Sequence, residues 1–163
     1  MSHAFDSREF RNALGMFPTG VAVVTTRAGN GAFVGLTINS FSSLSLEPPL
    51  VLWSLNSRSP SAAVFERATH FAVNILCQDQ VEISRCFASQ VPNKFAGIEV
   101  DAGLGDVPLI RNCSAHVECR AHAQHAGGDH LLFIGHVERF AYDRSKRPLV
   151  YHGGRYCLSG DYL

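Results

Sequence analysis

Short runs of β-branched and other apolar residues, separated by turn residues, recur along most of this chain. Such runs are typical of strands, and several of them with few helices between favour a β-barrel or sandwich. We expect strands at 20–26, 33–38, 50–55, 70–76, 115–123, 131–142 and 149–156. Helices are expected at 6–17, 59–67 and 80–88, and a loop over most of 91–108. A serine-rich stretch at 40–45 leads to Pro48 and Pro49. The sequence therefore predicts a mainly β fold, a barrel with peripheral helices.

The first expected helix has both a start signal and an apolar face. Asp6 is a suitable N-cap, and Glu9 follows three residues later, as in a capping box. Pro18 would end the helix. Its hydrophobic residues fall at helical spacing, namely Phe10, Ala13, Leu14 and Phe17. We therefore expect an amphipathic helix at the start of the chain.

Composition fits a single globular domain over residues 1–163. Of the 163 residues, 46% are hydrophobic, which is enough for a sizeable core. Charged residues make up 17%, a low share for a monomer with a fully wetted surface, which favours a buried subunit interface. The formal net charge is zero, so neither nucleic acid nor an anionic membrane would attract the protein over long range.

The sequence shows no recognisable targeting or membrane-spanning segment. Its start, MSHAFDSREF, lacks the basic residues and apolar run of a signal peptide. No apolar stretch is long enough to cross a bilayer. The five cysteines form no C-x-x-C motif and mostly lie in apolar stretches, so we expect reduced thiols. These features predict a soluble, cytoplasmic protein.

The eight histidines raise the question of a metal site. His116 and His122 share a strand face, but six residues at ~3.3 Å each place them about 20 Å apart, too far for one ion. His122, His125 and His130 span a strand end and a turn, which permits a site without supporting one. We expect no bound metal.

Common nucleotide and hydrolase motifs are absent. Gly103 and Gly105 begin a G-x-G, but Asp-Val-Pro follows instead of a third glycine before a helix. The sequence contains neither a Walker A motif nor G-x-S-x-G. A bound nucleotide would therefore need a different phosphate-binding loop.

Two hydroxyl-rich stretches are candidates for such a loop. The stretch 37–49 follows an expected strand, and its side chains and backbone N–H groups would suit a phosphate or the polar rim of a heterocycle. The alternative is a solvated serine loop. The stretch 54–61 places hydroxyls and Arg58 between a strand and a helix start, which favours an anion. The alternative is that Ser59 simply caps the helix.

Two shorter segments are weaker candidates. Lys94 next to Phe95 would hold a phosphate while the ring covers a flat cofactor, although an ordinary surface lysine explains the pair equally. His130 follows Gly128 and Asp129 at a turn, where it would bind an anionic or amide group of a substrate. The alternative is an ordinary turn histidine.

Taken together, these segments resemble the short-chain flavin reductase family, whose fold is the FMN-binding split β-barrel. The resemblance covers nearly the whole chain in the expected order, and the T-x-N-S-F-x-S-x-S run followed by Pro-Pro is its most specific part. The matching stretches are 17–26, 35–45, 48–51, 58–61, 71–76, 94–95, 128–130, 135–137 and 154–156.

The resemblance implies an NAD(P)H-dependent oxidoreductase that reduces FMN, or FAD, by hydride transfer from NADH or NADPH. The residues that would line the isoalloxazine and ribityl chain are Thr37, Ile38, Asn39 and Ser40. Those that would hold the ribityl and phosphate are Ser54, Leu55, Asn56, Ser57, Arg58 and Ser59, completed by Lys94 and Phe95. His130 would position the nicotinamide, with Tyr156 near the same pocket.

The resemblance also implies a homodimer with flavin sites at the subunit interface and a partner monooxygenase that receives reduced flavin. Two alternatives stay open: a split-barrel protein that keeps its flavin tightly bound as an electron carrier or oxidase, and a non-catalytic flavin-binding module. Neither FMN versus FAD nor NADH versus NADPH is decided by the sequence.

Overall fold

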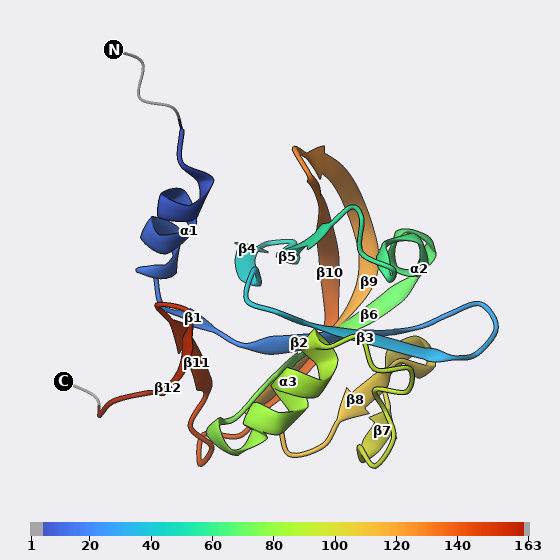
Figure 1. Ribbon diagram of the computed structural model, residues 1–163. Coiled ribbons are helices and arrows are strands. Elements are labelled where there is room, and N and C mark those ends of the chain that lie inside the picture. The colour runs from blue at the N-terminus through green and yellow to red at the C-terminus, as the bar shows by residue number, and fades with distance from the viewer. Residues whose placement is uncertain (1–4, 162–163) are drawn as a thin grey trace.

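A seven-stranded antiparallel sheet forms the body of the protein in the computed structural model, which describes residues 5–161 (Figure 1). Its strand order is β3-β2-β6-β9-β10-β5-β4, so β3 and β4 are edges and the barrel is not closed. The strands are β2 (Ala22–Arg27), β3 (Phe33–Ile38), β4 (Ser42–Leu46), β5 (Pro49–Asn56), β6 (His70–Ile75), β9 (Ala115–Gly127) and β10 (His130–Tyr142). This is the mainly β, split-barrel fold expected from the sequence.

Shorter elements surround this sheet. A small three-stranded sheet combines β1 (Thr19–Gly20), β11 (Leu149–His152) and β12 (Arg155–Leu158), and a ribbon pairs β7 (Val100–Ala102) with β8 (Pro108–Ile110). The helices are α1 (Ser7–Gly15), α2 (Ala62–Arg67) and α3 (Val81–Ala88), with 3-10 turns η1 (Gln78–Gln80) and η2 (Leu104–Asp106). Among residues 5–161, no helix is both long and apolar enough to span a membrane.

The main core packs around Trp53, which is fully buried. Its ring stacks on Phe133 at 4.5 Å between centroids and meets Phe65 and Phe71 edge to face. Such aromatic pairs add to the free energy gained by burying their area. Gly135 is required beside them, because a Cβ there would collide with the Phe71 ring and come within 2.8 Å of Cys119.

Strand β2 is buried on both faces, which explains its continuous apolar run. Val24 packs into the Trp53 core, whereas Val23 packs into a second cluster that includes Phe87 of α3 and Leu149 of β11. Alternation is lost wherever both faces of a strand are covered. Helix α3 therefore lies against the β2–β3 edge of the sheet (Figure 1).

One strand was missed and one local expectation was wrong. Within the serine-rich stretch 40–45, Ser42–Leu46 forms edge strand β4, which is paired with β5. The final expected strand, 149–156, is a hairpin in which β11 turns at Gly153 and Gly154, both with positive φ, into β12. The segment 91–108 is mostly loop, as expected, although it contains the short strand β7 and the start of β8, which pair with each other.

Helix α1 begins as expected. The Asp6 carboxylate accepts hydrogen bonds from the backbone N–H groups of Arg8 and Glu9. The helix stands apart from the barrel, however, and its apolar side chains are exposed, with Phe10 50% and Leu14 59% accessible (Figure 1). An apolar face without a partner in one chain calls for another surface to cover it.

Candidate functional site

A groove runs along edge strand β3, between that strand and helix α3. One cavity of about 230 Å³ is lined by Thr37, Ile38, Asn39, Ser84, Tyr156 and neighbouring residues. A second cavity of about 280 Å³ shares Thr37 and Ala88 with the first and adds Ser59, Ser61, Ser89 and Lys94. The shared residues place the two cavities side by side along β3, and we refer to them together as the groove, with hydroxyl groups along it and an ammonium group at one end.

The residues from Thr37 to Ser40 have different roles: some line the groove, and others hold the fold together. Thr37 lines both cavities, and its hydroxyl donates to the Ser84 carbonyl at 2.7 Å, which ties β3 to α3. Asn39 is exposed in the groove, whereas Ile38 is buried against the core. The Ser40 hydroxyl donates to the Ser54 carbonyl at 2.9 Å and accepts from the Ser54 N–H at 3.0 Å. Ser40 therefore anchors the end of the groove strand to β5.

Lys94 lies in the loop after α3. Its ammonium donates to the carbonyl of Phe87 at 2.9 Å and to that of Gly35 at 3.5 Å. Burial lowers the pKa of Lys94 below the ordinary lysine value. An ammonium has three N–H donors, so two carbonyl contacts leave one for an anion in the groove.

Phe95 is a packing residue behind this lysine. Its ring meets Phe87 edge to face at 4.9 Å between centroids. A Cβ at Gly35 would come within 2.8 Å of Phe87 and 3.3 Å of Phe95, so only glycine lets β3 approach these rings. This close approach fixes the loop that carries Lys94.

The residues from Ser54 to Ser59 also have different roles. Ser59 lines the groove, and Leu55 is a buried core residue. Ser57 donates from both its N–H and its hydroxyl to the Asp129 carbonyl, each at 3.0 Å. Asn56 accepts from the N–H of Arg58, which is exposed, at 2.9 Å. Apart from Ser59, this stretch therefore builds the turn that faces the β9–β10 hairpin.

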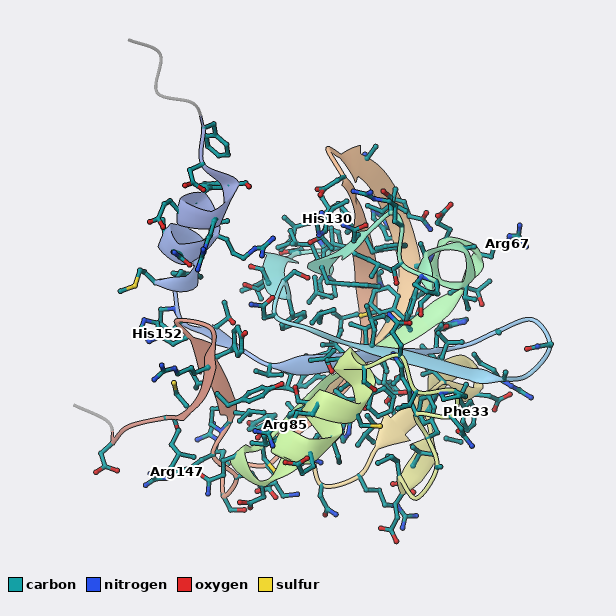
Figure 2. All side chains as sticks on the ribbon, in the orientation of Figure 1. Phe33, Arg67, Arg85, His130, Arg147 and His152 are labelled. Atoms are coloured by element: carbon teal, nitrogen blue, oxygen red, sulfur yellow. The ribbon has the colours of Figure 1, made fainter. Side chains whose placement is uncertain are left out.

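The structure places His130 and Tyr156 at different sites. His130 begins β10, pairs with Asn56, and its Nδ1 lies 2.7 Å from a carboxylate oxygen of Asp129 (Figure 2). The hydrogen bond with His130 lowers the pKa of Asp129. Tyr156 instead lines the groove, where its hydroxyl is 2.9 Å from the Ser84 hydroxyl. His130 is not among the residues that line the two groove cavities.

Two serines of the groove were missed from the sequence: Ser84 and Ser89. Ser84 is fully buried on α3, four residues before Ala88 and three before Phe87. A polar residue at helical spacing from apolar ones is a readable signal for a buried hydroxyl. Ser89 carries no such signal, because its place in the groove depends on how α3 packs against β3, whereas Ser61 belongs to the candidate stretch 54–61 and does line the groove.

The chemistry of the groove is that of binding. Its hydroxyls suit a flat, polar-edged molecule over Thr37 and Asn39, and Lys94 suits an anionic group at the other end. The arrangement fits reactions whose electronic chemistry belongs to a bound ligand.

Comparison with known proteins agrees with this description. The flavin reductase like domain matches residues 14–159. The chain is 41% identical over 156 residues to the flavin-dependent monooxygenase, reductase subunit HsaB, of Rhodococcus jostii, covering 95% of this chain and 79% of that protein. It is 44% identical over 153 residues to the FMN reductase (NADH) SmoA of Agrobacterium fabrum, covering 93% and 85%. The solved structure of the NADH:FAD oxidoreductase SgcE6 of Streptomyces globisporus, with NAD and FAD fragments, has a TM-score of 0.88 and 32% identity, covering 96% of each chain. The chain therefore belongs to the flavin reductase like family.

Proposed function

We propose that this protein is an NADH-dependent flavin reductase that supplies reduced flavin to a separate monooxygenase. The observation that carries the proposal is the groove along β3, which places a polar, hydroxyl-lined floor and one lysine in two adjoining cavities. The names of the relatives support the same activity, since HsaB is a reductase subunit of a flavin-dependent monooxygenase and SmoA is an NADH-dependent FMN reductase.

In this proposal the groove holds the flavin along β3. Thr37 and Asn39 contact the isoalloxazine ring, Ser59 and Ser61 contact the ribityl chain and phosphate, and Lys94 binds the phosphate. A flavin bound there would supply the hydride acceptor, N5, for the nicotinamide C4 hydride, and the reduced flavin would be released to the monooxygenase. Hydride transfer needs no side-chain acid or base, so the protein contributes binding and ring orientation.

We place the nicotinamide near the end of β5. Ser40 joins the groove strand to Ser54, and Asn56, two residues further along β5, pairs with His130. Two residues of extended chain span roughly 7 Å, so the imidazole is within reach of a dinucleotide lying over Asn39. His130 orients the nicotinamide from this side, while Tyr156 bounds the ring from the α3 side.

A homodimer is part of the proposal. On the face of β5 and β10 that points away from Trp53, Leu52 lies opposite Ile134 and Leu132 lies opposite Ser54, and all four are only half-buried. Together with the exposed apolar side of α1, this face offers a surface that a second copy would cover. Sedimentation at micromolar concentration should give twice the chain mass of 17.8 kDa, and a monomer would contradict the dimer.

We also propose a cytoplasmic location and a single functional domain. All five cysteines are free thiols, as suits a reducing compartment. NADH, the proposed electron donor, is available in that compartment.

The deciding experiment follows NADH and NADPH oxidation at 340 nm with and without added FMN, FAD and riboflavin. Turnover that depends on added flavin and NADH is the expected result. A yellow protein that does not turn over added flavin would instead favour a tightly bound flavin carrier or oxidase. Flavin binding without oxidation of either nucleotide would favour a binding module and contradict the reductase.

A further inference from the structure

The groove continues past Lys94 into a third cavity. This cavity has a volume of about 190 Å³ and shares Ser61, Val91 and Lys94 with the cavity before it. Its remaining lining comes from the start of β3 and from the loop after α3, namely Phe33, Val34, Gly35, Pro92, Asn93 and Phe95. A ligand whose phosphate lies at Lys94 therefore has built space on its far side.

Phe33 gives this third cavity an aromatic wall. The ring is 43% exposed and meets Phe95 at 5.5 Å between centroids, at an angle of 59°. Phe95 in turn packs against buried Phe87, so Phe33 is supported from behind by a row of aromatic rings. An exposed aromatic ring held in this way is a stacking surface for a flat base.

We propose that the third cavity binds the adenosine half of flavin adenine dinucleotide, with Phe33 stacking on the adenine. The inference rests on the proposed function, because it takes the FMN half to lie along Thr37 and Lys94. The adenosine of FAD is attached through that same phosphate, so it must continue beyond Lys94, where this cavity opens. Lys94 then faces the diphosphate, and Asn93 lies beside the ribose.

NADH also contains an adenosine that could stack on Phe33. The positions of the two ligands in the groove distinguish it from the adenosine of FAD. The hydride donor must reach the isoalloxazine end of the groove, at Thr37 and Asn39, which is the opposite end from Phe33. Figure 2 shows His130, the proposed nicotinamide contact, far from Phe33 across the barrel. The cavity at Phe33 is therefore assigned to the flavin.

Calorimetric titration of FMN and FAD into wild-type protein, Phe33→Ala and Phe33→Trp tests the assignment. Loss of a base–aromatic stack should weaken FAD about five- to tenfold in Phe33→Ala. FMN should bind all variants alike, and Phe33→Trp should retain wild-type affinity for FAD. An unchanged ratio of FAD to FMN affinity in Phe33→Ala would overturn the proposal, as would wild-type protein that binds FMN but not FAD.

A matched pair of cavity-filling variants tests the same cavity without altering an aromatic ring. Asn93→Trp fills part of the third cavity alone, which FMN does not enter, and should weaken FAD but not FMN. Gln90→Trp fills part of the phosphate cavity alone and should weaken both flavins. Equal effects of Asn93→Trp on the two flavins would contradict an adenosine site.

Two further outcomes separate this inference from the proposed function. A higher KM for NADH in Phe33→Ala at saturating FMN, with FAD affinity unchanged, would assign the cavity to NADH and overturn the inference while leaving the reductase intact. Wild-type protein that binds neither flavin would overturn both.

Discussion

Replacing Lys94 with methionine removes a charge while keeping a side chain of similar length. The ammonium contacts two carbonyl groups and has one donor left for a phosphate. A hydrogen bond to a charged partner contributes about 1.5–3 kcal/mol, which corresponds to about 10- to 150-fold in affinity. Because the lysine is only partly buried, we expect the lower end, roughly a tenfold weaker Kd for FMN.

Riboflavin provides the internal control, since it has the same ring and ribityl chain but no phosphate. Lys94→Met should leave its Kd unchanged, and Lys94→Arg should keep most of the FMN affinity. Titration by quenching of flavin fluorescence measures all of these constants. Equal loss of FMN and riboflavin would refute the argument and show that Lys94 only supports its loop through the Phe87 carbonyl.

The pH dependence gives a second readout of the same residue. Burial lowers the pKa of Lys94, so the ammonium loses its proton at a lower pH than an ordinary lysine. FMN affinity should therefore fall as pH rises through this lowered pKa, because the neutral amine attracts phosphate weakly. In Lys94→Met this alkaline decline should be absent, and its persistence would assign the titration to another group.

Three other substitutions follow from the geometry of the site. Gly35→Ala places a Cβ within 2.8 Å of Phe87, and overpacking of this kind costs about 1–3 kcal/mol, so Tm should fall by several degrees in a thermal melt; an unchanged Tm would contradict the tight fit. Tyr156→Phe leaves the buried Ser84 hydroxyl without its tyrosine partner and should lower the free energy of unfolding in urea by about 1 kcal/mol, whereas no loss would mean that the 2.9 Å contact contributes nothing. His130→Ala should raise KM for NADH more than the Kd for flavin, and an unchanged kcat/KM for NADH would disprove its role.

The sequence predicted strands where residue pattern and burial agree. The span of β3 matches the expected 33–38, and β2 was recognisable because a strand covered on both faces reads as one apolar run. Edge strand β4 was missed because its alternation covers only Ser43 to Leu46 and the strand has no β-branched residue. Its strand geometry comes from pairing with Leu52 and Val51 of β5, which no local pattern reveals.

The candidate site was predictable where one motif carries its residues and unpredictable where packing assembles them. Thr37 and Asn39 come from a single specific run, and the structure places both in the groove. Ser84 reaches the same groove from a helix 47 residues further along the chain. Leu55 is the opposite case, a predicted site residue that the structure places in the core. It lies on a strand, and alternate side chains of a strand point to opposite faces of the sheet.

The bond between Ser40 and Ser54 has a mechanical consequence. It joins the segment after β3 to β5. Strand β5 in turn pairs with β10 along its length, from Asn56 opposite His130 to Leu50 opposite His136. The floor of the groove and the β9–β10 hairpin that carries His130 are thus connected through β5 by hydrogen bonds. The alignment of hydride donor and acceptor would then be built into the sheet before either ligand arrives, and changing partners would require only that one molecule diffuse out and the next diffuse in.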